Sequence, residues 1–206
     1  MKKAVLQSFI LILFLMSVYI NAEEYTIYKG SYLATNLFGT ENCNLEIRFD
    51  DEKNIFYYFY QLPLTNTPTW IFLSENDLAI LRNNLAKFIE WEEIAQREKA
   101  SITRELPESE IPTSGVVQGT GYGRRECAAG LLILRFVFTT NTRINSPLLL
   151  ISSNQVYTRS LNNDIASMQI ANQLTKEQAQ TLLGGIQPEN ITSTLDRIRR
   201  QNNLFN

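Results

Sequence analysis

Residues 119–125, with the sequence GTGYGRR, form the segment whose composition most invites a chemical role. Closely spaced glycines can wrap a phosphate group, but this segment lacks the Lys-Ser or Lys-Thr pair of a P-loop. It also leads into Arg124, Arg125 and a strand-like stretch, so no helix N-terminus is expected to face an anion there. A turn or bulge is the favoured interpretation, and Arg124 and Arg125 are candidates for holding an anionic group.

Carboxylates gather in three places, and paired carboxylates can serve as acid and base in glycoside hydrolysis. The three places are residues 50–52 (DDE), residues 92–93 (EE), and Glu108 with Glu110. The first group falls in a predicted hairpin turn and the second on the polar face of a predicted helix, so solvated surface is the default for both. The ligand pattern of a calcium loop is absent, and no metal site is predicted.

The chain has no histidine and only two cysteines. Histidine-dependent zinc sites, Ser-His-Asp triads and Cys-His dyads are therefore excluded. Neither a Ser-x-x-Lys pair nor a Gly-x-Ser-x-Gly motif occurs. We expect no cofactor and favour a protein that is not an enzyme. The alternative is a small hydrolase or small-ligand-binding domain that uses carboxylates with Arg and Tyr near residues 119–125.

The first 22 residues have the pattern of a secretory signal peptide. Lys2 and Lys3 precede an apolar stretch over residues 4–20, and the small residue Ala22 precedes the expected cleavage site. The alternative is an uncleaved membrane anchor, because the apolar stretch approaches the length of a membrane span. Cleavage is favoured, and it predicts a periplasmic or secreted protein with no later membrane span.

The net charge of the chain limits the kinds of partner that it can bind. Removal of Lys2 and Lys3 lowers the basic residues from 19 to 17 against 21 acidic residues, so the net charge changes from −2 to −4. An acidic chain has little general affinity for nucleic acid or for anionic lipid. No nucleic-acid partner is therefore expected.

The two cysteines, Cys43 and Cys127, suit an oxidising compartment, where an even pair is more often bridged than free. A Cys43–Cys127 disulfide would close a long loop and stabilise the fold by about 4 kcal/mol in the chain-entropy description. Two separate buried thiols are the alternative.

Residues 43–50 alternate apolar and polar side chains, and a polar turn then leads into the aromatic segment 55–62 (IFYYFYQL), so a β-hairpin is expected. One face of the aromatic segment must pack under a helix. The other could form a binding platform, with Tyr58 and Tyr60 as candidate residues. Burial of both faces is the favoured alternative.

Helix starts are predicted at Ser74 and Thr175, because each has capping-box spacing to the third residue that follows. The first helix is expected over residues 75–104, with Trp91 on a second apolar stripe that makes it a candidate binding residue. The second helix ends at the glycines 184–185, and a last helix follows. Further expected strands are residues 25–34, with a kink near Gly30, and residues 69–73, 131–140, 148–152 extended over 155–158, and 166–170. A brief strand is also expected over residues 116–118, near the end of the irregular centre.

The landmarks of the first half recur in the same order in the second. Cys43 is followed by LEIRF and a helix start after Leu73, and Cys127 is followed by LILRF and a helix start after Leu174. This order suggests an internal duplication, although a chance match of short β-rich patterns is the alternative. The expected organisation is a signal peptide (1–22), a first ββββα unit (23–105), a linker or loop (106–123) and a second ββββα unit with a C-terminal helix (124–206), or one compact domain.

The resulting fold class is α+β, an antiparallel sheet with helices on one face. This element order is similar to that of the Whirly and PUR-type folds, which bind single-stranded nucleic acid, but the acidic balance and the export signal count against their function here. The leading hypothesis is an exported, non-enzymatic protein that binds another protein or an envelope component, and oligomers built on the same surfaces are one version of it.

Overall fold

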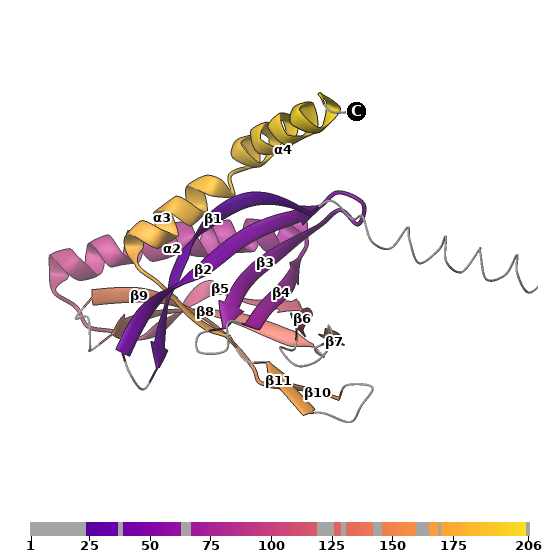
Figure 1. The fold of residues 1–206 in the computed structure, drawn as a ribbon. Helices are drawn as coiled ribbons and strands as arrows, with labels where there is room; N and C mark the ends of the chain where they lie inside the picture. Colours follow the sequence, from indigo (N-terminus) through magenta and orange to yellow (C-terminus); the bar gives the residue numbers. More distant parts are fainter. Residues whose placement is uncertain are drawn as a thin grey trace, which may run out of the picture.

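A computed structural model of the chain describes residues 24–36, 39–62, 67–118, 126–128, 131–141, 146–159, 165–168 and 170–204. Ten strands form one antiparallel sheet against which helices pack, which confirms the predicted α+β class (Figure 1). The strand order across the sheet is β5-β8-β9-β12-β1-β2-β3-β4-β6-β7. The signal-peptide prediction lies outside the described residues.

The first half of the chain forms a meander of four strands followed by a helix. Its elements are β1 (Glu24–Asn36), β2 (Gly39–Asp50), β3 (Ile55–Leu62), β4 (Thr67–Leu73) and α2 (Glu75–Glu98). The expected hairpin between β2 and β3 is confirmed, with the left-handed residue Asn54 closing its turn. The expected kink of β1 lies at a register shift between Thr26 and Tyr28, not at Gly30.

The second half supplies the rest of the sheet and two more helices. Its elements are β5 (Arg104–Thr113), β6 (Gly115–Gln118), β7 (Glu126–Ala128), β8 (Leu132–Asn141), β9 (Ser146–Ser153), β10 (Val156–Arg159), β11 (Ile165–Met168), β12 (Ala171–Leu174), α3 (Lys176–Gly185) and α4 (Pro188–Asn203). The strand expected to extend β9 is instead β10, which pairs with β11 in a separate two-stranded sheet. The strand expected around residues 166–170 is β11, and the last strand of the main sheet, β12, follows it.

Both predicted capping boxes are confirmed, at Ser74 for α2 and at Thr175 for α3. The first helix is shorter than expected. It ends at Glu98 because Lys99 takes a left-handed conformation and its N–H bonds the carbonyls of Ala95 and Gln96. The chain then turns into β5 at Arg104.

The expected linker over residues 106–123 is wrong for its first part, because residues 106–113 form most of β5. The brief strand expected over residues 116–118 is confirmed by β6. Pro107 and Pro112 are tolerated because β5 lies at the end of the strand order and pairs only with β8. The junction between β5 and β6 is bonded to β4, since Phe72 N–H donates to Ser114 O at 2.9 Å. The consecutive strands β5 and β6 thus pair with β8 and β4, which lie in opposite parts of the sheet.

A single hydrophobic cluster runs from Ile27 to Ile191 and contains side chains of both halves. Helices α2, α3 and α4 all contribute buried residues to it. The two four-strand blocks, β1-β2-β3-β4 before α2 and β5-β8-β9-β12 before α3, therefore share one core. The internal duplication itself stays a prediction.

The predicted Cys43–Cys127 disulfide is wrong, because Cys43 is a free, half-buried thiol. Cys43 lies on β2 and Cys127 on β7, and three strands separate these two in the sheet. At the usual strand spacing this is about 19 Å along the sheet, far beyond the reach of a disulfide. Cys43 instead lies opposite Tyr32 on β1, and burial raises the pKa of its thiol.

Candidate functional site

Tyr58 and Tyr60, the candidate platform residues, belong to the core. Each is only 1% exposed, and their rings meet edge to face with centroids 6.0 Å apart. Asn172 on β12 donates to the Tyr58 hydroxyl at 3.2 Å, and burial raises the pKa of both tyrosines. The opposite face of β3, with Tyr57 and Phe59, is also buried. Burial of both faces, the favoured alternative, is what the structure shows.

Trp91 is half-buried on α2, so it offers only part of the surface expected of it. Its ring packs against Phe138 of β8, with centroids 6.1 Å apart. The guanidinium of Arg104 lies 5.6 Å from its ring centroid. Trp91 thus joins α2 to the sheet. The candidates Arg124 and Arg125 lie outside the described residues.

The carboxylate groups noted in the sequence have structural partners. Asp50 is fully buried and accepts hydrogen bonds from the Lys53 backbone, the Lys53 ammonium and the Tyr57 hydroxyl, at 2.8–3.0 Å. Burial alone would raise the pKa of Asp50, but the hydrogen bonds from Lys53 and Tyr57 outweigh it and hold this pKa below its ordinary value. Asp51 pairs with Arg199 of α4 at 2.7 Å. These groups fix the β2–β3 turn.

The remaining carboxylates tie elements together. Glu92 is buried and pairs with Lys176 of α3 at 3.0 Å, and the exposed Glu93 pairs with the same ammonium at 3.1 Å. Glu110 of β5 pairs with Arg135 of β8 at 3.1 Å. Within the described part of the chain, no group of three or more possible metal ligands occurs. The hydrolase alternative therefore depends on residues 119–125, outside the described residues.

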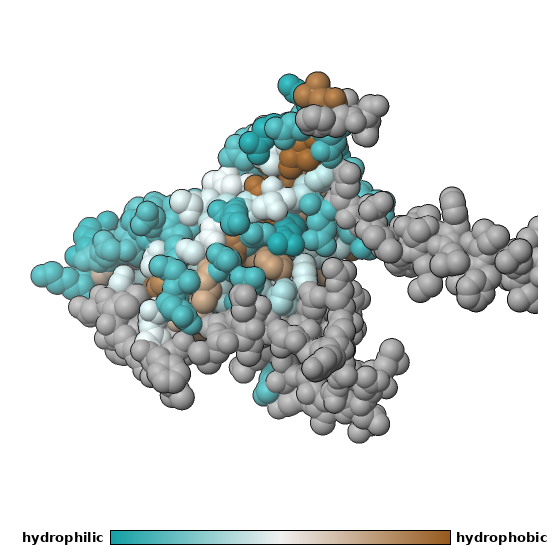
Figure 2. Space-filling model, in the orientation of Figure 1, coloured by the Kyte–Doolittle hydropathy of each residue, from teal (hydrophilic) through white to brown (hydrophobic). Residues whose placement is uncertain are grey.

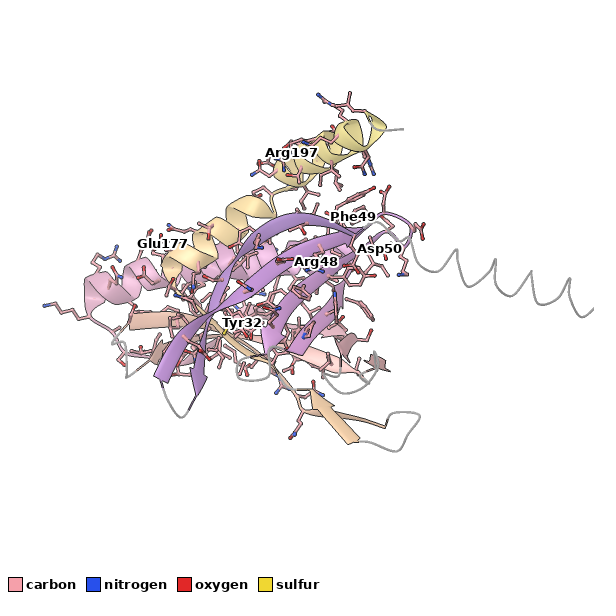
Figure 3. The ribbon with its side chains drawn as sticks, viewed as in Figure 1. Tyr32, Arg48, Phe49, Asp50, Glu177 and Arg197 are labelled. Carbon is pink, nitrogen blue, oxygen red and sulfur yellow. The ribbon has the colours of Figure 1, made fainter. Side chains whose placement is uncertain are left out.

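A polar ladder on the outer face of β2 was not foreseen from the sequence. Arg48 pairs with Glu46 at 2.7 Å and with Glu24 at 3.3 Å. Its guanidinium carbon lies 3.8 Å from the centroid of the Phe59 ring. Figure 3 shows Arg48 and Asp50 along this strand. Because Arg48 is bonded within the ladder, it stabilises the strand pairing and leaves little for a ligand.

A hollow with a mainly apolar lining lies where β4 ends and α2 begins, and we name it the α2 cleft. It measures about 690 Å³ and is lined by Asn54, Ile55, Phe56, Phe72, Leu73, Ser74, Glu75, Asp77, Thr113, Ser114 and Leu131. Four segments that are distant in the sequence meet there. No local pattern marks the cleft, so it could not be predicted from the sequence.

Leu131 stands at the mouth of the cleft and is 66% exposed. Its backbone is held by Asn154, whose amide nitrogen donates to Leu131 O at 3.2 Å while its amide oxygen accepts from Ile133 N at 2.7 Å. An exposed leucine on a fixed backbone, in the same cleft as the half-buried Phe72, offers apolar contact area at little ordering cost.

The walls of the cleft are equally well fixed. The Ser74 hydroxyl accepts from Asp77 N at 3.2 Å, and the Asp77 carboxylate accepts from Ser74 N at 2.8 Å. On the opposite side, the Thr113 hydroxyl donates to Phe72 O. The cleft is therefore preformed by the helix cap and by the junction between β5 and β6.

The surroundings of the cleft are acidic. Among the described residues, no Lys or Arg lines it, and none lines the neighbouring groove of about 630 Å³, formed by Asn76, Ala79, Ile80, Asn83, Glu108 and Glu110. Glu75 pairs with Arg82 at 3.6 Å and Glu110 pairs with Arg135, whereas Asp77 and Glu108 are hydrogen-bonded to neutral groups. Among the described residues, the α2 cleft and the neighbouring groove therefore each carry a net negative charge.

The fold and site define an α+β protein with a preformed, acidic and apolar surface cleft. No protein-family model matches the chain, and no match was found among curated proteins or solved structures. The likeness to Whirly and PUR-type folds is therefore one of element order alone. Within the described residues, no helix is long and apolar enough to cross a membrane.

Proposed function

We propose that the protein is an exported, non-enzymatic binding protein whose partner contacts the α2 cleft. The observation that carries this proposal is the cleft itself, with an apolar lining around Phe72, Leu73 and Leu131 and with the carboxylates of Glu75 and Asp77 as the charged groups among its described lining residues. An exposed, positioned apolar surface of this kind is typical of a contact site for another molecule.

The side chains that line the cleft indicate which kind of partner it would bind. Burying one apolar side chain there is worth roughly 1.5–3 kcal/mol, and a preformed site keeps most of that gain. Glu75 and Asp77 at the rim favour cations beside that side chain and disfavour carboxylates. The expected partner is a polypeptide segment that presents an apolar side chain flanked by Lys or Arg.

Site-specific photocrosslinking tests this function. Benzoylphenylalanine at position 131 should give a crosslinked product of defined mass in the cells that make the protein. The matched control is the same probe at Ile102, which is 47% exposed but does not line the cleft. Glu75→Lys should reduce the crosslink from position 131, because it places a cation at the rim. Equal yields at positions 131 and 102 would refute the proposal.

Export is tested separately by the intact mass of the protein recovered from the envelope or the medium. We expect a mass that corresponds to residues 23–206, with Cys43 reacting as a free thiol. A mass that includes residues 1–22 would contradict cleavage and favour a membrane anchor.

A further inference from the structure

Helix α4 projects from the body of the protein (Figure 1). One face of it packs inward, where Ile191 is buried and Leu195 and Ile198 are half-buried. The same side carries Arg199, which is bonded to Asp51 of the β2–β3 turn at 2.7 Å. The helix is therefore held in a defined direction by one face only.

The opposite face of α4 ends in a set of exposed residues that we name the α4 tip: Arg197, Arg200 and Leu204. Their spacings of three and four residues place them on one side of the helix. All three are exposed, and Leu204 reaches 79%. Figure 3 shows Arg197 on the projecting helix, and Figure 2 shows a hydrophobic patch near its end. The acidic residues of α4, Glu189 and Asp196, precede the tip.

The α4 tip has the chemistry that the α2 cleft requires, namely an apolar side chain flanked by two cations. We infer that the partner of the cleft is a second copy of this chain, whose Leu204 packs on Leu131 and Phe72 while its arginines face Glu75 and Asp77. This inference rests on the proposed function, because it names the partner of the same cleft. Opposite charges bring the two surfaces together, and apolar burial retains them.

The position of the two surfaces indicates a reciprocal dimer. Asp51 of the β2–β3 turn holds α4, and Asn54 of the same turn lines the cleft. Tip and cleft therefore flank one end of the molecule, and two copies that face each other can each insert a tip into the other's cleft. An isologous pair of this kind is the commonest form of soluble oligomer.

Sedimentation velocity on the purified full chain tests the dimer. The wild-type protein should show a concentration-dependent monomer–dimer equilibrium. Leu131→Lys, which blocks the cleft, and Arg197→Glu with Arg200→Glu, which reverses the tip, should each weaken the dimer by about tenfold or more. Leu204→Ser tests the tip without changing its charge, in case the double variant loosens the end of α4. The controls are Ile102→Lys and the pair Lys87→Glu with Arg97→Glu, which should leave the equilibrium unchanged.

Mixing the two blocked variants gives the sharpest result. The Leu131→Lys chain keeps an intact tip and the Arg197→Glu, Arg200→Glu chain keeps an intact cleft. A mixed pair therefore retains one of the two contacts and should associate more strongly than either variant alone, but less strongly than wild type. A wild-type monomer up to the solubility limit, or a mixture no stronger than the separate variants, would overturn the inference.

The crosslinking experiment separates this inference from the proposed function. If position 131 crosslinks to a different protein while the purified chain stays monomeric, the dimer is refuted and the binding function stands. If position 131 crosslinks no more than position 102 and the chain is monomeric, both are refuted.

Discussion

Two strand-to-helix junctions in this protein begin with the same local device and end in different surroundings. At the first, Leu73 leads into the capping box of Ser74 and Asp77, and at the second, Leu174 leads into that of Thr175 and Gln178. The Ser74 junction borders the apolar α2 cleft. The Thr175 junction borders a hollow of about 540 Å³ whose polar groups are bonded to one another.

At the second junction, which we call closed, side-chain hydrogen bonds join helix α3 to the sheet. Gln178 donates to Ser31 at 3.0 Å and to Asn42 at 3.2 Å, which joins α3 to β1 and β2. The Tyr28 hydroxyl lies 3.3 Å from that of Thr181 on the same helix. Among the described residues, Asp77, the counterpart of Gln178, is bonded within its own cap. A capping box therefore starts a helix in either setting. Tertiary contacts decide whether the residues around the cap stabilise the fold or stay open to a partner.

A large effect on stability is expected at one of the two junctions, where α3 touches β1. A Cβ added at Gly185 would lie 2.4 Å from the Tyr28 ring, whereas at Gly184 it would meet no atom within 4 Å. Gly185→Ala should therefore reduce the free energy of unfolding by about 2 kcal/mol. Gly184→Ala should raise it by about 0.5 kcal/mol, since only chain entropy changes. Urea denaturation measures both, and equal effects would mean that the second junction is not closed by tight packing.

The next change in stability is expected at the β2–β3 turn, which links α4 to the cleft, and its size depends on pH. Asp50→Asn should reduce the free energy of unfolding by about 1.5 kcal/mol at pH 7, because the ion pair with Lys53 is lost. The folded-state pKa of Asp50 lies below the unfolded value of about 3.9, so the stabilisation is fully present above that value. It is lost as the pH falls through the folded pKa.

Chemical denaturation between pH 7 and pH 2 measures this difference. The wild-type and Asp50→Asn curves should converge at the acid end. A constant offset across the range would show that the charge of Asp50 does not hold the turn.

A smaller change in the free energy of unfolding is expected at the two capping boxes, and it should differ between them. Gln178→Glu keeps the acceptor for the Thr175 amide but removes the donor to Ser31 and Asn42, so we expect a loss of about 1 kcal/mol. Asp77→Asn is the matched change at the first junction and should cost about 0.5 kcal/mol, because only local capping is affected. Equal losses in thermal unfolding would contradict a closed second junction.

These junctions also show what the sequence could and could not predict. The strands and capping boxes follow local rules, namely alternation over residues 43–50 and hydroxyl residues at Ser74 and Thr175, and they are confirmed. The length of α2 was overestimated because nothing local marked Lys99 as a left-handed stop. The strand β5 was missed because its prolines are compatible with an edge strand, and edge position is set by tertiary pairing.

The site residues were harder to predict than the fold. Tyr58 and Tyr60 drew attention through their aromatic character, but the curled sheet buries both faces of β3. The α2 cleft combines residues near 54, 73, 113 and 131, and their meeting depends on the junction of β5 and β6 with β4. The disulfide prediction was wrong for the same reason, because an even number of cysteines carries no information about strand order.

The smallest effect on stability is the one that most directly tests the first junction as a binding surface. Leu131 is 66% exposed and its neighbour Leu132 is fully buried. Leu131→Ala should change the free energy of unfolding by no more than about 0.5 kcal/mol, whereas Leu132→Ala should reduce it by about 3 kcal/mol. Urea denaturation under conditions that keep the chain monomeric makes the comparison. A leucine that adds nothing to stability, yet is positioned by both ends of the Asn154 amide, has its apolar surface available for a partner. A loss of 2 kcal/mol or more for Leu131→Ala would instead mean that Leu131 packs within its own chain and that the cleft is closed in solution.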